Sequence, residues 1–206
     1  MSTRPHAMAE ERTATRSPRP RLLLVCAVAL IGGFGLSAAL TAPLAPEHRQ
    51  GVGEWGAIVL FAAAARPRAG IDARTRRRPN LGTLPLAAGL LGYWTGLAAT
   101  TGLWPRLGQA AIATAAILAI VTLTALIGTL SAGDMKLFLS IGLLTAWFSW
   151  MLPLYALAAG YLIAIPHAAI LLARKRTNPD RDTRLPFGPY LIAAAIAAAS
   201  VAAIVT

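Results

Sequence analysis

The chain has 206 residues, of which 56% are hydrophobic and only 13% are charged, with a mean hydropathy of +0.60. Soluble domains normally carry about 25% charged residues, so this composition excludes an ordinary cytosolic domain. The net charge of +11 is not evidence for nucleic acid as a partner, because the basic residues lie between apolar runs rather than along one face. One cysteine, Cys26, excludes an internal disulfide framework and a zinc site built from cysteine pairs.

The N-terminal segment, residues 1–21, carries five arginines and two acidic residues and is expected to form a disordered basic tail in the cytoplasm. The apolar run 22–43 follows it. This run is longer than the ~7–15 residues of a signal-peptide core and long enough to cross ~30 Å of hydrocarbon. It therefore predicts a retained membrane helix.

Six further apolar runs predict an all-α, polytopic membrane bundle. The run 51–65 is short for a span, but it crosses if it tilts or if flanking arginines snorkel to the interface. The other five runs are 81–104, 107–130, 137–151, 154–173 and 187–206. The first two of these form a hairpin with a tight turn at Trp104-Pro105-Arg106. The sequence therefore predicts about seven transmembrane helices, or six if 51–65 does not span.

The lysines and arginines support seven spans. With 51–65 crossing, seventeen of the nineteen basic residues fall on one side of the membrane. The positive-inside rule then places the N-terminus and the loops around residues 72, 134 and 180 in the cytoplasm. Without that crossing, the first two basic clusters would face opposite sides. We expect a multi-pass protein of the plasma membrane.

Two of the eight acidic residues, Asp72 and Asp134, lie at cytoplasmic ends of predicted spans, where an ionisable group is a candidate for function. The other six are expected to be solvated loop charges: Glu10, Glu11, Glu47, Glu54, Asp180 and Asp182. The hairpin 81–130 returns the chain to its starting side, so Asp72 and Asp134 can face each other.

Two close carboxylates tend to share one proton, so that one activates water while the other donates a proton. That is the chemistry of aspartyl proteolysis. The alternatives from the residues alone are helix-end charges paired with Arg74 or Lys136, and a proton relay.

Three segments occur in order along the last two-thirds of the chain, from about Ile71 to the C-terminus. Residues 71–80 read Ile-Asp-Ala-Arg-Thr-Arg-Arg-Arg-Pro-Asn, residues 128–138 read Gly-Thr-Leu-Ser-Ala-Gly-Asp-Met-Lys-Leu-Phe, and residues 185–190 read Leu-Pro-Phe-Gly-Pro-Tyr. Together they resemble the type IV prepilin peptidase family, membrane aspartyl proteases of the GxGD type. That family shows an Asp before a Pro-Asn stretch, then Gly-x-Gly-Asp-x-Lys-Leu, then Pro-Phe-Gly-Pro.

The resemblance makes Asp72 and Asp134 the catalytic aspartates. It also implies supporting roles for the other motif positions, which are Pro79, Asn80, Ser131, Gly133, Lys136, Pro186, Phe187, Gly188 and Pro189. Gly133 would leave room for an extended substrate, and Lys136 would hold negative charge or phospholipid, with a snorkelling lysine as the alternative. Residues 186–189 would form a rigid entry to the last helix.

Two positions depart from the family pattern. Ser131 replaces the first glycine of the Gly-x-Gly-Asp motif, which reduces backbone freedom there. Arg78 stands where an apolar residue usually precedes Pro-Asn, and adds charge beside Asp72.

The resemblance implies an endopeptidase that removes the basic leader from type IV or Flp-type prepilins at the cytoplasmic face. Its expected partners are precursors with a basic leader and an apolar helix, together with membrane lipid, and no nucleic acid. Larger family members carry a cytoplasmic insertion with cysteine pairs and also methylate the new N-terminus. This chain has neither the insertion nor the pairs, so it is similar to the short, peptidase-only form of Flp/Tad pilus systems. We expect no metal and no S-adenosylmethionine.

The chain divides into the tail 1–21, N-terminal helices 22–66 outside the resemblance, and a peptidase core 67–206. Two other functions remain open. One is a small proton- or cation-coupled transporter that uses Asp72 and Asp134, and the other is a catalytically inactive pilus-assembly subunit, which the Ser131 change would suit.

Several residues have simpler expected roles. His167 is expected to hydrogen-bond a neighbouring helix. The glycines at 89, 92 and 96 are expected to pack against another helix. Four tryptophans are expected to form an interfacial belt: Trp94, Trp104, Trp147 and Trp150.

Overall fold

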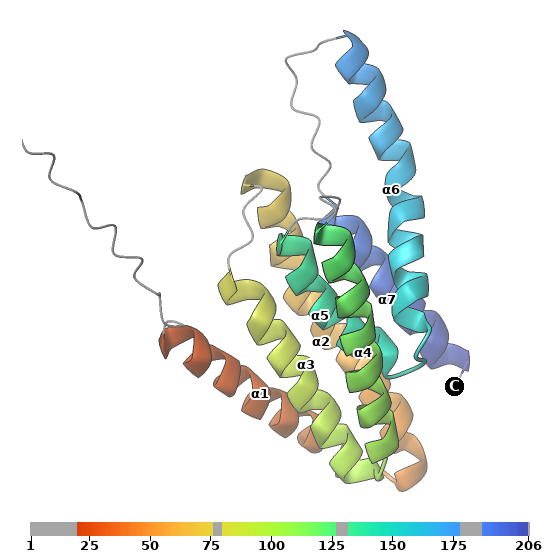
Figure 1. Cartoon of the computed structure of the whole chain (residues 1–206). Helices are drawn as coiled ribbons and strands as arrows, with labels where there is room; N and C mark the ends of the chain where they lie inside the picture. The colour runs from red at the N-terminus through yellow and green to blue at the C-terminus, as the bar shows by residue number, and fades with distance from the viewer. Residues whose placement is uncertain (1–19, 76–79, 127–131, 178–186, 206) are drawn as a thin grey trace, which may run out of the picture.

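A computed structural model of the chain describes residues 20–75, 80–126, 132–177 and 187–205, with backbone alone at several helix ends. These residues form seven helices and no strand (Figure 1). The helices are α1 (Pro20–Thr41), α2 (Pro46–Thr75), α3 (Asn80–Thr101), α4 (Trp104–Leu126), α5 (Ala132–Ala146), α6 (Leu152–Thr177) and α7 (Gly188–Val205). The expected all-α architecture and the order of its elements are confirmed.

Prolines mark where most helices begin. Five of the seven helices have proline as their first or second residue, where the missing N–H has no intrahelical partner and the fixed φ suits the helix. These prolines are Pro20, Pro46, Pro105, Pro153 and Pro189. The helix α1 therefore begins inside the expected tail 1–21, and α2 continues unbroken past residue 66.

The turn between α3 and α4 lies earlier than predicted. Gly102 adopts φ +77° after the last turn of α3, and its N–H donates to the carbonyl of Ala98 at 2.8 Å. The predicted turn at Trp104-Pro105-Arg106 is wrong, since these residues form the first turn of α4. Glycine reaches positive φ without a Cβ clash, so Gly102 ends α3, and proline suits a helix start, so Pro105 lies in the first turn of α4.

Successive helices run in opposite directions, as Figure 1 shows. One end of the bundle therefore gathers the C-termini of α2, α4 and α6 and the N-termini of α3, α5 and α7; we call it the aspartate end, because α2 carries Asp72 there and α5 carries Asp134. The opposite end carries the connections α1–α2, α3–α4 and α5–α6. The helix α2 contacts α3, α5 and α7, and α5 also contacts α3 and α7, while α1 packs on α3 at one side and α6 on α7 at the other.

Two tryptophans lie in the core rather than in an interfacial belt. Trp94 of α3 and Trp147, just after α5, are fully buried and stack with ring centroids 4.3 Å apart. The indole N–H of Trp94 donates to the carbonyl of Leu143 at 2.9 Å. The belt prediction is wrong for these two, since stacking removes both rings from the surface. Trp104 and Trp150 are 52% and 66% exposed, as a belt requires.

Glycines hold α1 against α3. A Cβ at Gly92 would overlap the carbonyl of Leu30, and one at Gly96 would lie 2.7 Å from the carbonyl oxygen of Phe34. Gly33 of α1 meets the backbone of Gly89 in the same way. The packing role expected for these glycines is confirmed, because small residues let two membrane helices approach closely.

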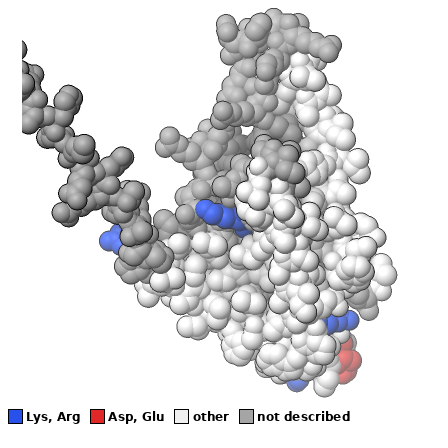
Figure 2. Space-filling model, viewed as in Figure 1, with Lys and Arg blue, Asp and Glu red and all other residues white. Residues whose placement is uncertain are grey.

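Four of the helices are long and apolar enough to cross a membrane: the candidate spans are Arg21–Thr41, Trp104–Leu123, Leu152–Ala173 and Gly188–Val205. The part of α5 from Met135 to Ala146 is a shorter apolar helix. In Figure 2, charges of both signs gather at the end opposite the aspartate end, below a wide uncharged surface. The chain is thus a multi-pass membrane protein with four candidate spans by length and composition.

The glycine contact between α1 and α3 gives a direct test. The change Gly92→Ala is expected to lower the free energy of unfolding by about 1–3 kcal/mol, because its Cβ must push the Leu30 backbone away. Unfolding in detergent micelles, followed by circular dichroism, measures this. The matched control is Gly32→Ala, where a Cβ meets nothing within 4 Å and stability should not fall. Equal stability of the two variants would contradict this packing.

Candidate functional site

The two aspartates singled out by the sequence lie at one end of the bundle. Asp72 is in the last turn of α2, and Asp134 is the third residue of α5. The two helices contact each other and run in opposite directions, so both positions lie at the aspartate end (Figure 1). Asp72 was expected in a cytoplasmic loop, but its backbone is helical. Their side chains lie outside the described part of the structure.

A contact between α2 and α5 at the opposite end of the bundle gives a common reference point for the axial positions of the two aspartates. The indole N–H of Trp147 donates to Oε1 of Glu54 at 3.2 Å, which joins the end of α5 to α2. Asp72 is 18 residues beyond Glu54, about 27 Å along the helix at ~1.5 Å per residue. Asp134 is 13 residues before Trp147, about 20 Å by the same rise. The two backbone positions therefore differ by only about 7 Å in height, little more than one helical turn.

The last motif begins α7 at this same end. Gly188 is buried, and Phe187 packs on Tyr161 of α6 with ring centroids 4.6 Å apart. The carbonyl of Phe187 accepts the N–H of Leu191 at 3.3 Å, which starts the helix. Since α7 contacts both α2 and α5, the helix that this motif begins adjoins the two helices that carry the aspartates.

The other motif positions are only partly described. Lys136 is half-buried in the first turns of α5. The helical backbone includes Asn80 and Gly133, and the side chain of Asn80 lies outside the described part. The expected roles of Pro79, Ser131 and Pro186 also concern residues outside the described part.

The histidine of α6 has the partner that was expected. His167 Nδ1 is hydrogen-bonded to the hydroxyl of Tyr190, in the first turn of α7. The two rings meet edge to face, with centroids 5.8 Å apart. Together with the contact between Tyr161 and Phe187, this pair ties α6 to the beginning of α7.

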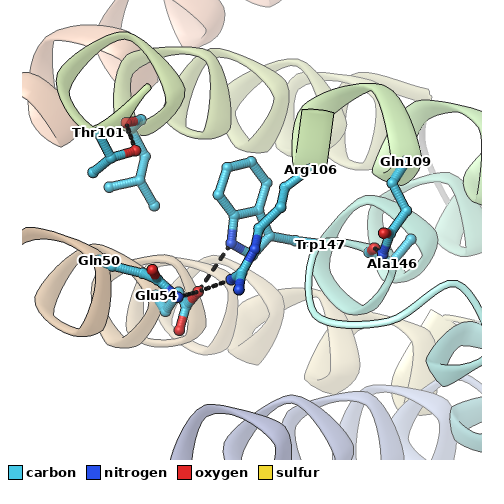
Figure 3. A network of polar contacts seen from close by, with 8 residues as sticks. Gln50, Glu54, Thr101, Arg106, Gln109, Ala146 and Trp147 are labelled. Carbon is cyan, nitrogen blue, oxygen red and sulfur yellow. Dashed lines mark hydrogen bonds and ion pairs between the residues drawn. The ribbon is translucent and has the colours of Figure 1, made fainter. Parts of the chain in front are cut away.

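One buried carboxylate was missed at the sequence level. Glu54 was expected to be a solvated loop charge, but it lies in the third turn of α2 and is 1% exposed. Its Oε1 accepts from Arg106 of α4 at 2.9 Å, from Trp147 at 3.2 Å and from Gln50 of α2 at 3.1 Å (Figure 3). We call these four residues the Glu54 network. Gln109 of α4 adds a neighbouring contact, donating to the carbonyl of Ala146 at 3.2 Å.

The Glu54 network satisfies a charge that would otherwise be costly. Burying a carboxylate costs several kcal/mol unless a cation and further donors replace its hydration. The guanidinium of Arg106 supplies the cation and keeps 33% of its side chain exposed. The sequence did hold a sign of this pair, because Arg106 and Glu54 stand at the ends of adjacent predicted hairpins on the side with only two basic residues.

The second basic residue on that side is also held in place. The guanidinium of Arg49 donates to the carbonyls of Leu44 at 2.9 Å, Thr100 at 3.2 Å and Ala42 at 3.3 Å. The carbonyls of Ala42 and Thr100 lie at the C-terminal ends of α1 and α3, where a cation is favoured by the helix dipole. Polar contacts therefore join the helices at this end of the bundle.

Among the described residues, no group of three or more His, Cys, Asp or Glu side chains is placed to hold a metal ion. Comparison of the chain with protein-family models, with curated proteins and with solved structures found no match. Sequence motifs and the arrangement of the helices are therefore the features of this chain that bear on its function.

Removing the buried carboxylate tests the Glu54 network. In Glu54→Ala, Arg106 and the Trp147 indole lose their shared acceptor. Breaking a fully buried ion pair costs ~3–5 kcal/mol, and we expect a smaller loss here because a third of Arg106 is exposed. Unfolding in mixed micelles measures the change. The control is Glu47→Ala on the same helix, whose side chain is 69% exposed and whose loss should cost less than about 0.5 kcal/mol. Similar stabilities for the two variants would contradict the burial of Glu54.

Proposed function

We propose that the chain is a membrane aspartyl endopeptidase that removes the basic leader from prepilin-like precursors at the cytoplasmic face of the plasma membrane. In this proposal it is the short, peptidase-only form of the type IV prepilin peptidases. The observation that supports it most is that two contacting, antiparallel helices carry Asp72 and Asp134 at the same end of the bundle. The ordered motifs around these residues give the reaction class.

The proposal includes a full topology. All seven helices cross the membrane, the N-terminus lies in the cytoplasm, and the aspartate end faces the cytoplasm. The helix α2 has 30 residues, about 45 Å at ~1.5 Å per residue, which exceeds the ~30 Å hydrocarbon layer. Its last turn, with Asp72, can then stand in the interface, where a basic leader and water are both accessible.

The chemistry follows from two carboxyl groups that share one proton. The ionised carboxylate takes a proton from water as the water oxygen attacks the carbonyl carbon of the scissile peptide. The neutral carboxyl donates its proton to the carbonyl oxygen, giving a tetrahedral intermediate. The C–N bond then breaks as the carboxyl that took the proton from water gives it to the leaving nitrogen, and the other carboxylate takes a proton back from the tetrahedral intermediate. No covalent enzyme intermediate forms.

Helix ends make the two aspartate positions unequal. The first turn of a helix favours negative charge, and the last turn disfavours it, by typically ~0.3–1 kcal/mol. Asp134 is in a first turn and Asp72 in a last turn. The two positions therefore stand in helix-dipole fields of opposite sign.

The described helices favour this reading over a transporter. Transport sites lie near the middle of the bilayer, on interrupted helices. Of the charged side chains that the structure describes, Glu47, Arg49, Glu54 and Arg106 lie toward the end opposite the aspartates, and Arg21 and Lys136 toward the ends where α1 and α5 begin. An inactive pilus-assembly subunit would have the same fold but would not cleave a precursor, so a cleavage assay distinguishes it from a peptidase.

Cleavage of a substrate tests the proposal. When the chain is co-expressed with a Flp-type prepilin, we expect leader removal after glycine, detected by gel mobility and intact mass. Asp72→Asn and Asp134→Asn should each lower the rate by about 10²–10⁴-fold, because each removes one partner of the acid–base pair. Asp180→Asn, which changes an acidic residue of the predicted loop around residue 180, is the matched control, and this variant should cleave normally.

Two outcomes would count against the proposal. Cleavage that survives either substitution would remove that aspartate from catalysis. A prepilin left intact by the wild-type chain, but processed once Ser131→Gly is introduced, would identify an inactive member of the fold.

A further inference from the structure

The Glu54 network joins the two helices that carry the proposed aspartates, at the end away from them. Glu54 is on α2, as is Asp72, and Trp147 follows the last residue of α5, which carries Asp134. Figure 3 shows Arg106 and Trp147 converging on the Glu54 carboxylate from α4 and from the end of α5. Three helices thus meet at one oxygen.

Small residues make up much of the buried surface of α2. Gly53 packs against Leu97 and Gly56 against the hydroxyl of Tyr93, both on α3. Further along α2, Ala57 and Ala65 are fully buried, and so is the large side chain of Phe61. Small side chains permit close approach but interlock weakly, so packing leaves part of the choice of register to other contacts. A directional polar contact can select one register, which is the best-attested use of buried polar groups.

We propose that Glu54 is a positioning residue that sets the axial register of α2 against α5, and so the relative height of Asp72 and Asp134. This inference rests on the function proposed for those two aspartates. A slip of one residue changes the height by ~1.5 Å, and a slip of one turn by ~5.4 Å. Both exceed the ~1 Å error that can cost 10²-fold in rate, so catalysis at one end depends on a contact about 27 Å away.

Cysteine cross-linking measures the register without any substrate. Cys26 is the single native cysteine, so Cys26→Ala gives a clean background. In the full chain we introduce Arg68→Cys with Asp134→Cys, because position 68 is 14 residues, about 21 Å, beyond Glu54 and so stands level with Asp134. Separately we introduce Ala64→Cys or Asp72→Cys with Asp134→Cys, which probe one turn on either side. Each pair is oxidised in membranes with Glu54 intact and in Glu54→Leu/Arg106→Leu. That double change leaves no unpaired charge, so we expect the fold to be retained.

We expect the 68–134 cross-link with Glu54 intact, because the two positions stand at about the same height. In Glu54→Leu/Arg106→Leu its yield should fall at least about tenfold, because cysteines with Cα atoms more than ~7 Å apart cannot be joined, and a one-turn pair should gain it. Glu47→Ala is the control and should keep the 68–134 cross-link. An unchanged 68–134 yield in the double variant overturns the positioning role and leaves the proposed function intact. No 68–134 cross-link with Glu54 present overturns both.

A kinetic readout separates positioning from plain stability. In the enzyme with both aspartates, Glu54→Leu/Arg106→Leu should lower kcat per folded molecule about 100-fold and leave KM within about twofold. A purely structural role would lower the folded yield and leave kcat per folded molecule unchanged, which would overturn the inference.

Discussion

A polypeptide inside a lipid bilayer must hydrogen-bond its own backbone, because the hydrocarbon offers no partners. For this chain that constraint produces helices joined by short connections, and short connections make successive helices antiparallel. Segments distant in sequence then meet at one end of the bundle. The last turn of α2 and the first turn of α5 both lie at the aspartate end in this way, although more than fifty residues separate them.

The two ends of the bundle have different physical characters. The end opposite the aspartates is held by fixed polar contacts, with Glu54 paired to Arg106 and with Arg49 on the carbonyls of two helix ends. The middle is packed by aromatic stacking between Trp94 and Trp147 and by glycine contacts between α1 and α3. A rigid base of this kind would suit a peptidase whose reacting groups stand at the other end, in contact with water and with a leader peptide.

Much of the fold could be predicted from the sequence, because the length of an apolar run and the proline at its start are local properties. The seven runs correspond to the seven helices within a few residues at most ends. Tertiary contacts could not be predicted in this way. The environments of Glu54, Trp94 and Trp147 depend on which faces of α2, α3 and α5 meet, and a helix that is apolar all round gives no periodic signal for its inward face. The turn at Gly102 was misplaced for a local reason, since proline can mark either a turn or a helix start.

The same distinction between local and tertiary properties applies to the candidate site. Motif order and helix direction place Asp72 and Asp134 at a common end, but the register of α2 against α5 is a tertiary property that depends on Glu54 and Trp147. The sequence therefore predicts that Asp72 and Asp134 act together, whereas the distance between them depends on how the helices pack. In the proposed function, the glycine that precedes Asp134 and the serine at 131 would affect substrate access, which helix packing does not decide.

The central claim is that Asp72 and Asp134 lie on the same, cytoplasmic side of the membrane, opposite Glu47. Labelling of single cysteines with a membrane-impermeant maleimide tests this most directly, in the Cys26→Ala background. We predict that Asp72→Cys and Asp134→Cys react only in inside-out vesicles, and that Glu47→Cys reacts in intact cells. Labelling of positions 72 and 134 from opposite sides would contradict the account.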